Sequence, residues 1–267
     1  MIKLISFDMD GTFLNSENDY DRVRFAQIVQ SAKSKGIRLV ANSGNQYQQI
    51  AAFFEDYLDD IVIVSEIGAQ IHEQGERIAC HYFEDAVVVD ILRLLAEKGL
   101  LSRCSVSGLE ALYFEKGAEP DFKKTITKHN FVWREIDSLL ELPQDHFTIL
   151  TLDVPGQDIA ALVDEMNHVG QGQVKAVSSG FHFIDIVLPH INKGTALAFL
   201  GQRWGIQPEE MMAFGDSDND LDMLEYVGYS YAMEGSPASV EAVARFQAPS
   251  NNASGVLQTI ENMLEIL

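Results

Sequence analysis

Short, mostly apolar runs recur at both ends of the chain, and they constrain the fold more than any other feature. They cover residues 2–7, 37–41, 61–65, 211–214 and 227–233. Segments with the apolar spacing of helices lie between them. Strands that are apolar on both faces and alternate with helices are typical of a parallel sheet covered by helices on both sides. The sequence therefore predicts an α/β fold with a Rossmann-like parallel-sheet core, built from both ends of the chain.

The middle of the chain has a different character. Between residues 82 and 188, helix-like segments alternate with short strands. The alternating pattern of residues 181–188 predicts a strand that follows a hairpin turn at residues 178–180. We expect this segment to be an inserted α+β domain rather than a continuation of the parallel sheet. The predicted boundaries are 1–81 and 189–267 for the core and 82–188 for the insertion.

The chain is strongly acidic, with 40 Asp and Glu residues against 19 Lys and Arg and a formal charge of −21. Such a surface repels nucleic acid and anionic membranes. It also repels a phosphorylated metabolite at long range, so a phosphate site here would need a local positive field. A metal ion, a lysine and helix N-termini can supply that field. The alternative is that the acidic surface serves only solubility.

Two cysteines, Cys80 and Cys104, are too few for a disulfide framework and do not form a Cys-x-x-Cys pair. We interpret them as reduced residues, which fits a reducing cytoplasm. Asp8 and Asp10 interrupt the apolar N-terminal run, so it is too short for a signal-peptide core or a membrane span. We therefore expect a soluble cytoplasmic protein that binds neither nucleic acid nor membrane. Whether it is a monomer or a homodimer stays open.

Two carboxylates follow the first predicted strand directly, in residues 8–14, which read DMDGTFL. The carboxyl ends of parallel strands form the crevice where open α/β sheets bind ligands, and Gly11 permits a turn that brings Asp8 and Asp10 into it. Adjacent buried anions are costly, and a divalent cation with hard oxygen ligands, such as Mg²⁺, offsets that cost. Taken alone, however, the motif is more simply a loop with two solvated aspartates.

Two weaker polar signals occur further along the chain. Ser43-Gly44 follows the strand of residues 37–41, where a hydroxyl and a backbone N–H can both donate to a phosphate oxygen. Lys193 stands at the start of a predicted helix, where a cation opposes the helix dipole and an anion would stabilise both. Alone, Ser43-Gly44 is more simply an ordinary turn, and Lys193 is equally well a solvated surface residue.

A dense acidic run, GDSDND, occupies residues 215–220 after the strand of residues 211–214. Aspartate favours helix N-caps, so an acidic helix start is the simpler interpretation of one such residue. Asp216, Asp218 and Asp220 together exceed what capping needs. This excess favours a metal site.

The order of these four signals resembles the haloacid dehalogenase superfamily, whose motifs are Asp-x-Asp-Gly-Thr, a Ser or Thr, a Lys and Gly-Asp-x-x-Asn-Asp. Over its whole length the chain is similar to the Cof-like sugar-phosphate phosphatases of that superfamily. The resemblance implies a Mg²⁺-dependent phosphomonoester hydrolase that forms an aspartyl-phosphate. It also implies that residues 82–188 are an α/β cap that sets substrate specificity.

The resemblance assigns a role to each motif. Asp8 attacks phosphorus, and Asp10 protonates the leaving alcohol and then activates water. The Asp8 side chain, the Asp10 backbone carbonyl and the Asp216 side chain hold Mg²⁺. Asp220 orients Lys193 or a metal-bound water. The groups that bind the transferring phosphoryl group are Ser43, Gly44, Lys193 and Asn219.

The chain departs from many of these relatives at two positions. Asn45 replaces an arginine that would bring a second positive charge to the substrate, and Ile67 replaces an asparagine that could donate to it. In the cap, residues 179–185 are the predicted substrate contact, with His182 and Asp185 as the polar groups. The alternative is that His182 and Asp185 are half-buried strand residues hydrogen-bonded across a sheet.

The expected substrate is a small phosphorylated metabolite, such as a sugar phosphate, and the expected cofactor is Mg²⁺. Two other functions stay open: a phosphomutase, which shares the aspartyl-phosphate step, and a catalytically silent sensor of a phosphorylated ligand. Asp8, Asp10, Lys193 and Asp216 are all present, which favours turnover over sensing. The physiological substrate and the choice between Mg²⁺ and Mn²⁺ are not determined by the sequence.

Overall fold

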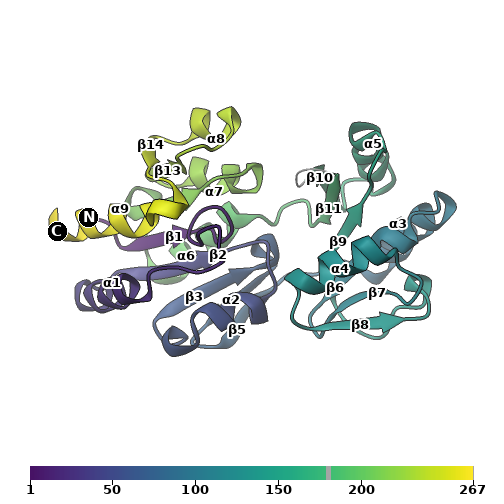
Figure 1. The fold of residues 1–267 in the computed structure, drawn as a ribbon, viewed down its shortest axis with the longest axis horizontal. Helices are drawn as coiled ribbons and strands as arrows, with labels where there is room; N and C mark the ends of the chain where they lie inside the picture. Colours follow the sequence, from purple (N-terminus) through teal and green to yellow (C-terminus); the bar gives the residue numbers. More distant parts are fainter. Residues whose placement is uncertain (179–181, 267) are drawn as a thin grey trace. The chain divides into compact units, whose positions relative to one another are not determined.

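The computed structural model describes residues 1–178 and 182–266, which form two compact units (Figure 1). One unit joins Met1–Ala79 to Asn192–Leu267, and the other is Cys80–Ile191. Each unit has its own sheet and its own hydrophobic core. Within the described residues, no helix is both long enough and apolar enough to cross a membrane.

The first unit is built on an eight-stranded sheet, counted over the described residues, in the order β14-β13-β12-β1-β2-β3-β4-β5. Neighbouring strands from β14 to β3 are parallel, and β4 is antiparallel to β3. The strands are β1 (Leu4–Phe7), β2 (Arg38–Asn42), β3 (Ile61–Ser65), β4 (Gln70–Glu73), β5 (Glu76–Cys80), β12 (Met211–Gly215), β13 (Tyr229–Met233) and β14 (Phe246–Ala248). The predicted α/β fold with a parallel-sheet core is therefore confirmed.

Helices bury both faces of this sheet. On one face Phe25 and Ile260 pack in a single cluster with Phe7 of β1, and on the other Leu197 and Met223 pack with Val40 of β2. Burial of large apolar side chains on both faces is what makes the strands read as continuous apolar runs. The helices are α1 (Arg22–Lys35), α2 (Tyr47–Phe53), α6 (Lys193–Trp204), α7 (Leu221–Tyr226), α8 (Ala238–Val243) and α9 (Gly255–Ile266).

The strand order brings distant segments of the chain to one edge of the sheet. β1 lies between β12 and β2, with Phe7 paired to Phe214 on one side and to Ala41 on the other. Because these three strands are parallel, the residues that follow each of them emerge at the same edge. The polar motifs of the sequence therefore meet there.

The second unit contains a six-stranded sheet, counted over the described residues, in the order β10-β11-β9-β6-β7-β8. Its neighbouring strands are antiparallel except for β7 and β8. The elements are β6 (Cys104–Gly108), β7 (Leu112–Glu115), β8 (Trp133–Ile136), β9 (Phe147–Asp153), β10 (Lys175–Ser178), β11 (Phe183–Val187), α3 (Asp85–Glu97), α4 (Pro120–His129) and α5 (Ile159–Val169). Helices α3 and α5 pack in the main cluster of this unit, and α4 packs in a smaller one around Phe114 and Phe122.

Two features of the fold were not predicted. In the β4–β5 connection Gln74 and Gly75 adopt left-handed conformations, with φ of 54° and 77°. Such conformations are typical of the two-residue turns that join the strands of a β-hairpin. Strand β8 was not predicted because it lies at the sheet edge, where Trp133 is half exposed and the apolar pattern of the sequence is weak. The hairpin turn predicted at residues 178–180 reaches into the segment 179–181, outside the described residues.

Candidate active site

Asp8 begins the site directly after β1. Its backbone N–H donates to the carbonyl of Phe214 in the neighbouring strand, at 3.1 Å, so the sheet fixes its position. The side chain is buried, whereas that of Asp10 is exposed. Gly11, one residue after Asp10, has a left-handed φ of 81°. A Cβ atom on it would come within 2.5 Å of Asp216 Oδ2. Glycine is therefore required by both conformation and space.

Lys193, the first residue of α6, is completely buried. Its Nζ atom lies 2.6 Å from Asp8 Oδ1, 2.6 Å from Asp220 Oδ1 and 3.2 Å from Asn219 Oδ1. Asn192 caps the helix just before it, and its side chain accepts from the backbone N–H of Thr195 at 2.7 Å. The cap fixes where α6 begins and so where the lysine enters the site.

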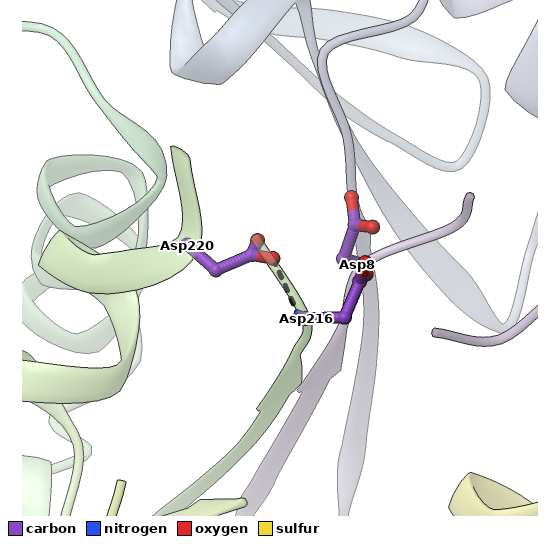
Figure 2. A group of neighbouring side chains, drawn as sticks. All are labelled: Asp8, Asp216 and Asp220. Atoms are coloured by element: carbon purple, nitrogen blue, oxygen red, sulfur yellow. Dashed lines mark hydrogen bonds between the residues drawn. The ribbon is translucent and has the colours of Figure 1, made fainter. Parts of the chain in front are cut away.

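Asp216 and Asp220 follow β12, and Figure 2 shows their carboxylates beside that of Asp8. Both oxygens of Asp220 accept hydrogen bonds inside the protein: Oδ1 from Lys193, and Oδ2 from the backbone N–H groups of Asp216 at 2.9 Å and Ser217 at 3.1 Å. Asp216 Oδ1 accepts from the hydroxyl of Thr12 at 2.6 Å. The ends of β1 and β12 are thus joined by side-chain bonds as well as by the sheet.

Ser43, Gly44 and Asn45 form the loop after β2. The Ser43 side chain is buried, and its Oγ accepts from the backbone N–H of Asn45 at 3.1 Å. The Asn45 side chain donates from Nδ2 to Asp10 Oδ2 at 2.6 Å. Asn42, the last residue of β2, donates to the backbone carbonyl of Lys193 at 3.1 Å. The end of β2 and the loop after it are therefore tied to Asp10 of the first motif and to Lys193.

A left-handed turn braces this loop. Glu66 and Ile67 have backbone φ angles of 51° and 56°, values that residues other than glycine rarely adopt. Their backbone N–H groups donate to the carbonyls of Asn45 and Ser43, at 3.0 and 3.1 Å. A Cβ atom on the next residue, Gly68, would come within 2.5 Å of the backbone oxygen of Asn192. The turn fills the space between the Ser43 loop and the start of α6.

Burial governs the ionisation of these groups. It raises the pKa of Asp8 well above its ordinary value, which the Lys193 charge opposes and the Asp220 and Asp216 charges reinforce. It also raises the pKa of Asp216 to about 6, against the effect of the hydrogen bond from Thr12. Burial alone would lower the pKa of Lys193, but the Asp220 and Asp8 carboxylates reverse this and raise it. The lysine therefore stays charged. Its single positive charge is outnumbered by the three neighbouring carboxyl groups.

Asp8, Asp216 and Asp220 form a group that can hold a metal ion. One oxygen of each lies within 4.8 Å of the others. Hard carboxylate oxygens suit Mg²⁺, and a divalent cation would offset the excess of negative charge. Since Asp220 already uses both oxygens within the protein, Asp8 and Asp216 are the better direct ligands. The donor set fits a divalent cation.

The predicted motif residues thus come together within one unit, and the structure gives roles to neighbours for which the sequence analysis assigned none. Thr12 belongs to the first motif and bonds Asp216, and Asn42 directly precedes Ser43 in the sequence, which is the signal that would have found it. Asn45 and Ile67 drew notice only as departures from relatives. Their contacts with Asp10 and Ser43 depend on a three-dimensional arrangement that no local pattern encodes.

His182 and Asp185, predicted as substrate contacts, lie in the other unit. There His182 Nδ1 contacts Asp153 Oδ1, and Asp185 Oδ1 accepts from the hydroxyl of Thr151 at 2.8 Å. The first is a contact between residues at the end of the β9–β11 pair, and the second is a cross-strand hydrogen bond of that pair. Residues 179–181 of the predicted contact segment lie outside the described residues. The substrate role of His182 and Asp185 stays a prediction.

Comparison with known proteins identifies the family of the chain. Residues 5–260 match the family model of haloacid dehalogenase-like hydrolases. The chain is 34% identical to 5-amino-6-(5-phospho-D-ribitylamino)uracil phosphatase YbjI of Escherichia coli, with 99% of this chain and 97% of the relative covered. A Bacillus subtilis phosphatase named for the same compound is 25% identical, with 98% of each chain covered.

A solved structure from Streptococcus mutans has the same fold, with a TM-score of 0.93, 34% sequence identity, and coverage of 99% of this chain and 100% of that one. Its likeness extends over both units rather than over the parallel-sheet core alone. The predicted membership is confirmed: the chain belongs to the haloacid dehalogenase-like hydrolases, and the relatives described above are named as phosphatases.

Proposed function

We propose that this protein is a Mg²⁺-dependent phosphomonoester hydrolase that works through an aspartyl-phosphate on Asp8. One observation carries the proposal: a fully buried lysine holds the Asp8 carboxylate at 2.6 Å within a group of three carboxylates. A structural ion pair needs one carboxylate for one lysine. The additional acidic groups have a physical reason if a metal ion and a phosphoryl group share the site.

Phosphoryl transfer to the protein is the first step. An oxygen of Asp8 forms a bond to phosphorus while the bond from phosphorus to the substrate alcohol breaks, and the proton of the Asp10 carboxyl moves to the departing oxygen. Asp10 then accepts a proton from the water that attacks the phosphorus of the aspartyl-phosphate. The acyl-phosphate bond to Asp8 breaks and inorganic phosphate leaves.

The side chains of Asp8 and Asp216, with the backbone carbonyl of Asp10, would hold Mg²⁺. When bound, the ion supplies positive charge to the phosphoryl oxygens. Lys193 adds the charge of its ammonium group, and Asp220 orients that group through their 2.6 Å bond. The Ser43 hydroxyl, the backbone N–H of Gly44 and the Asn219 amide are neutral donors for the remaining oxygens.

The Ser43 hydroxyl is prepared for this donation. Its oxygen already accepts the backbone N–H of Asn45, so its own hydrogen is available to a ligand. Asn219 is positioned similarly, because its Oδ1 accepts from Ser217 at 2.8 Å and from Lys193, which turns its NH₂ group to the opposite side. A Cβ atom built on Gly44 would lie 3.9 Å from that NH₂ nitrogen, so the donors converge.

We assign substrate selection to the unit Cys80–Ile191, with His182 and Asp185 as its first polar candidates. Two relatives named for 5-amino-6-(5-phospho-D-ribitylamino)uracil direct attention to phosphate esters of primary alcohols on polyol chains. That compound and simple sugar phosphates are therefore the first substrates to test. The proposed physiological substrate class is small phosphorylated metabolites.

The test is phosphate release from a panel of these esters, with Mg²⁺ or with EDTA, by the wild type and by Asp8→Asn. We expect Mg²⁺-dependent release that falls by at least about 10⁴-fold in the variant, because a nucleophile has no substitute at that position. Asp19→Asn removes an exposed carboxylate of the same chain segment and serves as the matched control.

Trapping the intermediate separates hydrolysis from its rivals. Wild-type protein mixed with substrate and quenched in acid should carry an acyl-phosphate, which Asp8→Asn should lack. No release from any ester by folded, Mg²⁺-binding protein would contradict the proposal. Transfer of the phosphoryl group back to sugar instead of water would identify a phosphomutase.

A further inference from the structure

We propose that Asn45 is a positioning residue for Asp10: its amide holds the Asp10 carboxyl group in place for proton transfer to the leaving alcohol. This inference rests on the proposed function, in which Asp10 is the acid. The contact that carries it is the 2.6 Å bond from Asn45 Nδ2 to Asp10 Oδ2. The two residues are 35 positions apart and follow different strands, β1 and β2.

Asp10 needs such a partner because of where it lies. Its side chain is exposed, unlike the buried side chains of Asp8, Ser43 and Lys193. An exposed carboxyl group rotates freely among its rotamers unless a neighbour fixes it. Proton transfer requires the acid to lie within hydrogen-bond reach of the departing oxygen. A donor that restricts Asp10 therefore raises the fraction of time that its carboxyl group is in position.

Asn45 is itself held at the backbone on both sides. Its N–H donates to Ser43 Oγ at 3.1 Å, and its carbonyl accepts from the N–H of Glu66 at 3.0 Å. The residue that donates this second bond, Glu66, lies in the left-handed turn that braces the loop. The amide side chain is thus carried by a fixed backbone rather than by a free loop, which is what precise positioning requires.

The same residue connects two catalytic tasks. Its backbone N–H occupies a lone pair of the Ser43 oxygen and so directs that hydroxyl as a donor, while its side chain directs Asp10. Only the second task depends on the side chain, so a substitution at Asn45 separates them. Loss of the amide should leave the Ser43 loop in place and release Asp10.

The experiment compares two kinds of leaving group. An alkyl phosphate needs a proton on its departing oxygen, whereas p-nitrophenyl phosphate releases a stable phenolate that needs little help. We use kcat/KM because it covers steps only up to release of the alcohol and so excludes hydrolysis of the aspartyl-phosphate. The variants are Asn45→Leu, which has nearly the same shape without the donor, and Asn45→Asp, which replaces the donor with an acceptor.

Gln48→Leu is the matched control, since it removes an exposed amide from the same region of the chain. Asp10→Asn gives the full effect of losing the acid. We expect Asn45→Leu to lower kcat/KM for the alkyl ester at least about tenfold more than for the aryl ester, as part of the about 10²–10⁴-fold that a general acid contributes. Adding Asn45→Leu to Asp10→Asn should cause little further loss.

Three outcomes would overturn the inference. Equal losses on both esters would mean that Asn45 binds the phosphoryl group or supports the loop. Full additivity in the double variant would mean that it acts independently of Asp10. If Asp10→Asn itself shows no preference between the esters, the proposed acid is wrong and the inference fails with it. In the first two cases Asp10→Asn still discriminates, so the proposed function survives.

Discussion

Each unit contains an ionic cluster around a buried carboxylate, and the two clusters differ in how far their other members are buried. In the first unit Lys193 is the only cation that contacts the described group of Asp8, Asp216 and Asp220. In the second, the buried Asp153 carboxylate contacts both Arg103, at 2.6 Å, and the imidazole of His182. Arg103 also bonds both oxygens of the exposed Asp121.

The difference shows which of the two clusters needs a ligand. Charges near the surface keep part of their hydration and need no ligand to offset them. An excess of one sign is costly to bury, so it persists only where a ligand of opposite charge offsets it. Arg103, Asp121 and His182 are partly or largely exposed, whereas Lys193, Asp8 and Asp220 are buried.

The largest effect that sharpens this comparison is expected for Lys193→Met. It leaves buried carboxylates without their cation, so the free energy of unfolding should fall by about 3–5 kcal/mol. Under the proposed function turnover should also be lost, because the variant lacks the ammonium charge proposed to face the phosphoryl group. Urea unfolding and phosphate release measure the two effects. A variant that kept full stability in the absence of metal would show that the cluster is not coupled as its distances indicate.

Metal should substitute for protons at the same cluster. Since the pKa of Asp216 is raised to about 6 from an ordinary value of 3.8, the folded metal-free protein binds a proton there more tightly than the unfolded chain does. Its stability should therefore fall as pH rises from about 4 to about 6. Asp8 is shifted in the same direction and adds to the fall.

If Mg²⁺ occupies this group it binds the ionised carboxylates, and it should then reverse this loss. At a free Mg²⁺ concentration of about 100 times its Kd, binding should stabilise the folded protein by about 2.7 kcal/mol. Thermal unfolding with and without Mg²⁺ should show a much larger shift at about pH 7.5 than at about pH 5. The shift should be lost in Asp216→Asn, and equal shifts at both pH values would contradict the assignment of these carboxylates as ligands.

The smallest of these effects is expected for Arg103→Met in the partly exposed cluster. Asp153 keeps its contact with His182, so the cost is that of one weakened buried acceptor, about 1–3 kcal/mol. Calorimetry measures this change. Mg²⁺ should give the variant the same thermal shift as the wild type. A Mg²⁺-dependent difference between the two proteins would mean that the clusters are not independent.

The sequence predicted which motif residues lie together because parallel strands impose a rule. Asp8, Ser43 and Asp216 each follow a strand, and such residues meet at one edge whatever their separation along the chain. The antiparallel unit obeys no comparable rule, and there the prediction named His182 and Asp185 without their partners Asp153 and Thr151.

Local conformation was equally hard to predict where packing overrides propensity. Nothing in a β-branched residue such as Ile67 favours a left-handed backbone. Its conformation follows from the backbone bonds to the Ser43 loop and from the close approach of Gly68 to Asn192. These contacts join residues far apart in the chain, and only the finished fold specifies them.

The position of β1 between β12 and β2 has a consequence for synthesis of the protein. A ribosome that has made β1 must translate the whole of Cys80–Ile191 before it reaches β12, which takes roughly 6–20 s at typical rates. Throughout that interval the flank of β1 that later pairs with β12 stays unpaired, and at the end of it the contiguous insertion has every residue it needs. Nascent-chain chaperones should therefore encounter a chain whose insertion is complete but whose parallel sheet is not. We expect them to bind the first few strands of that sheet.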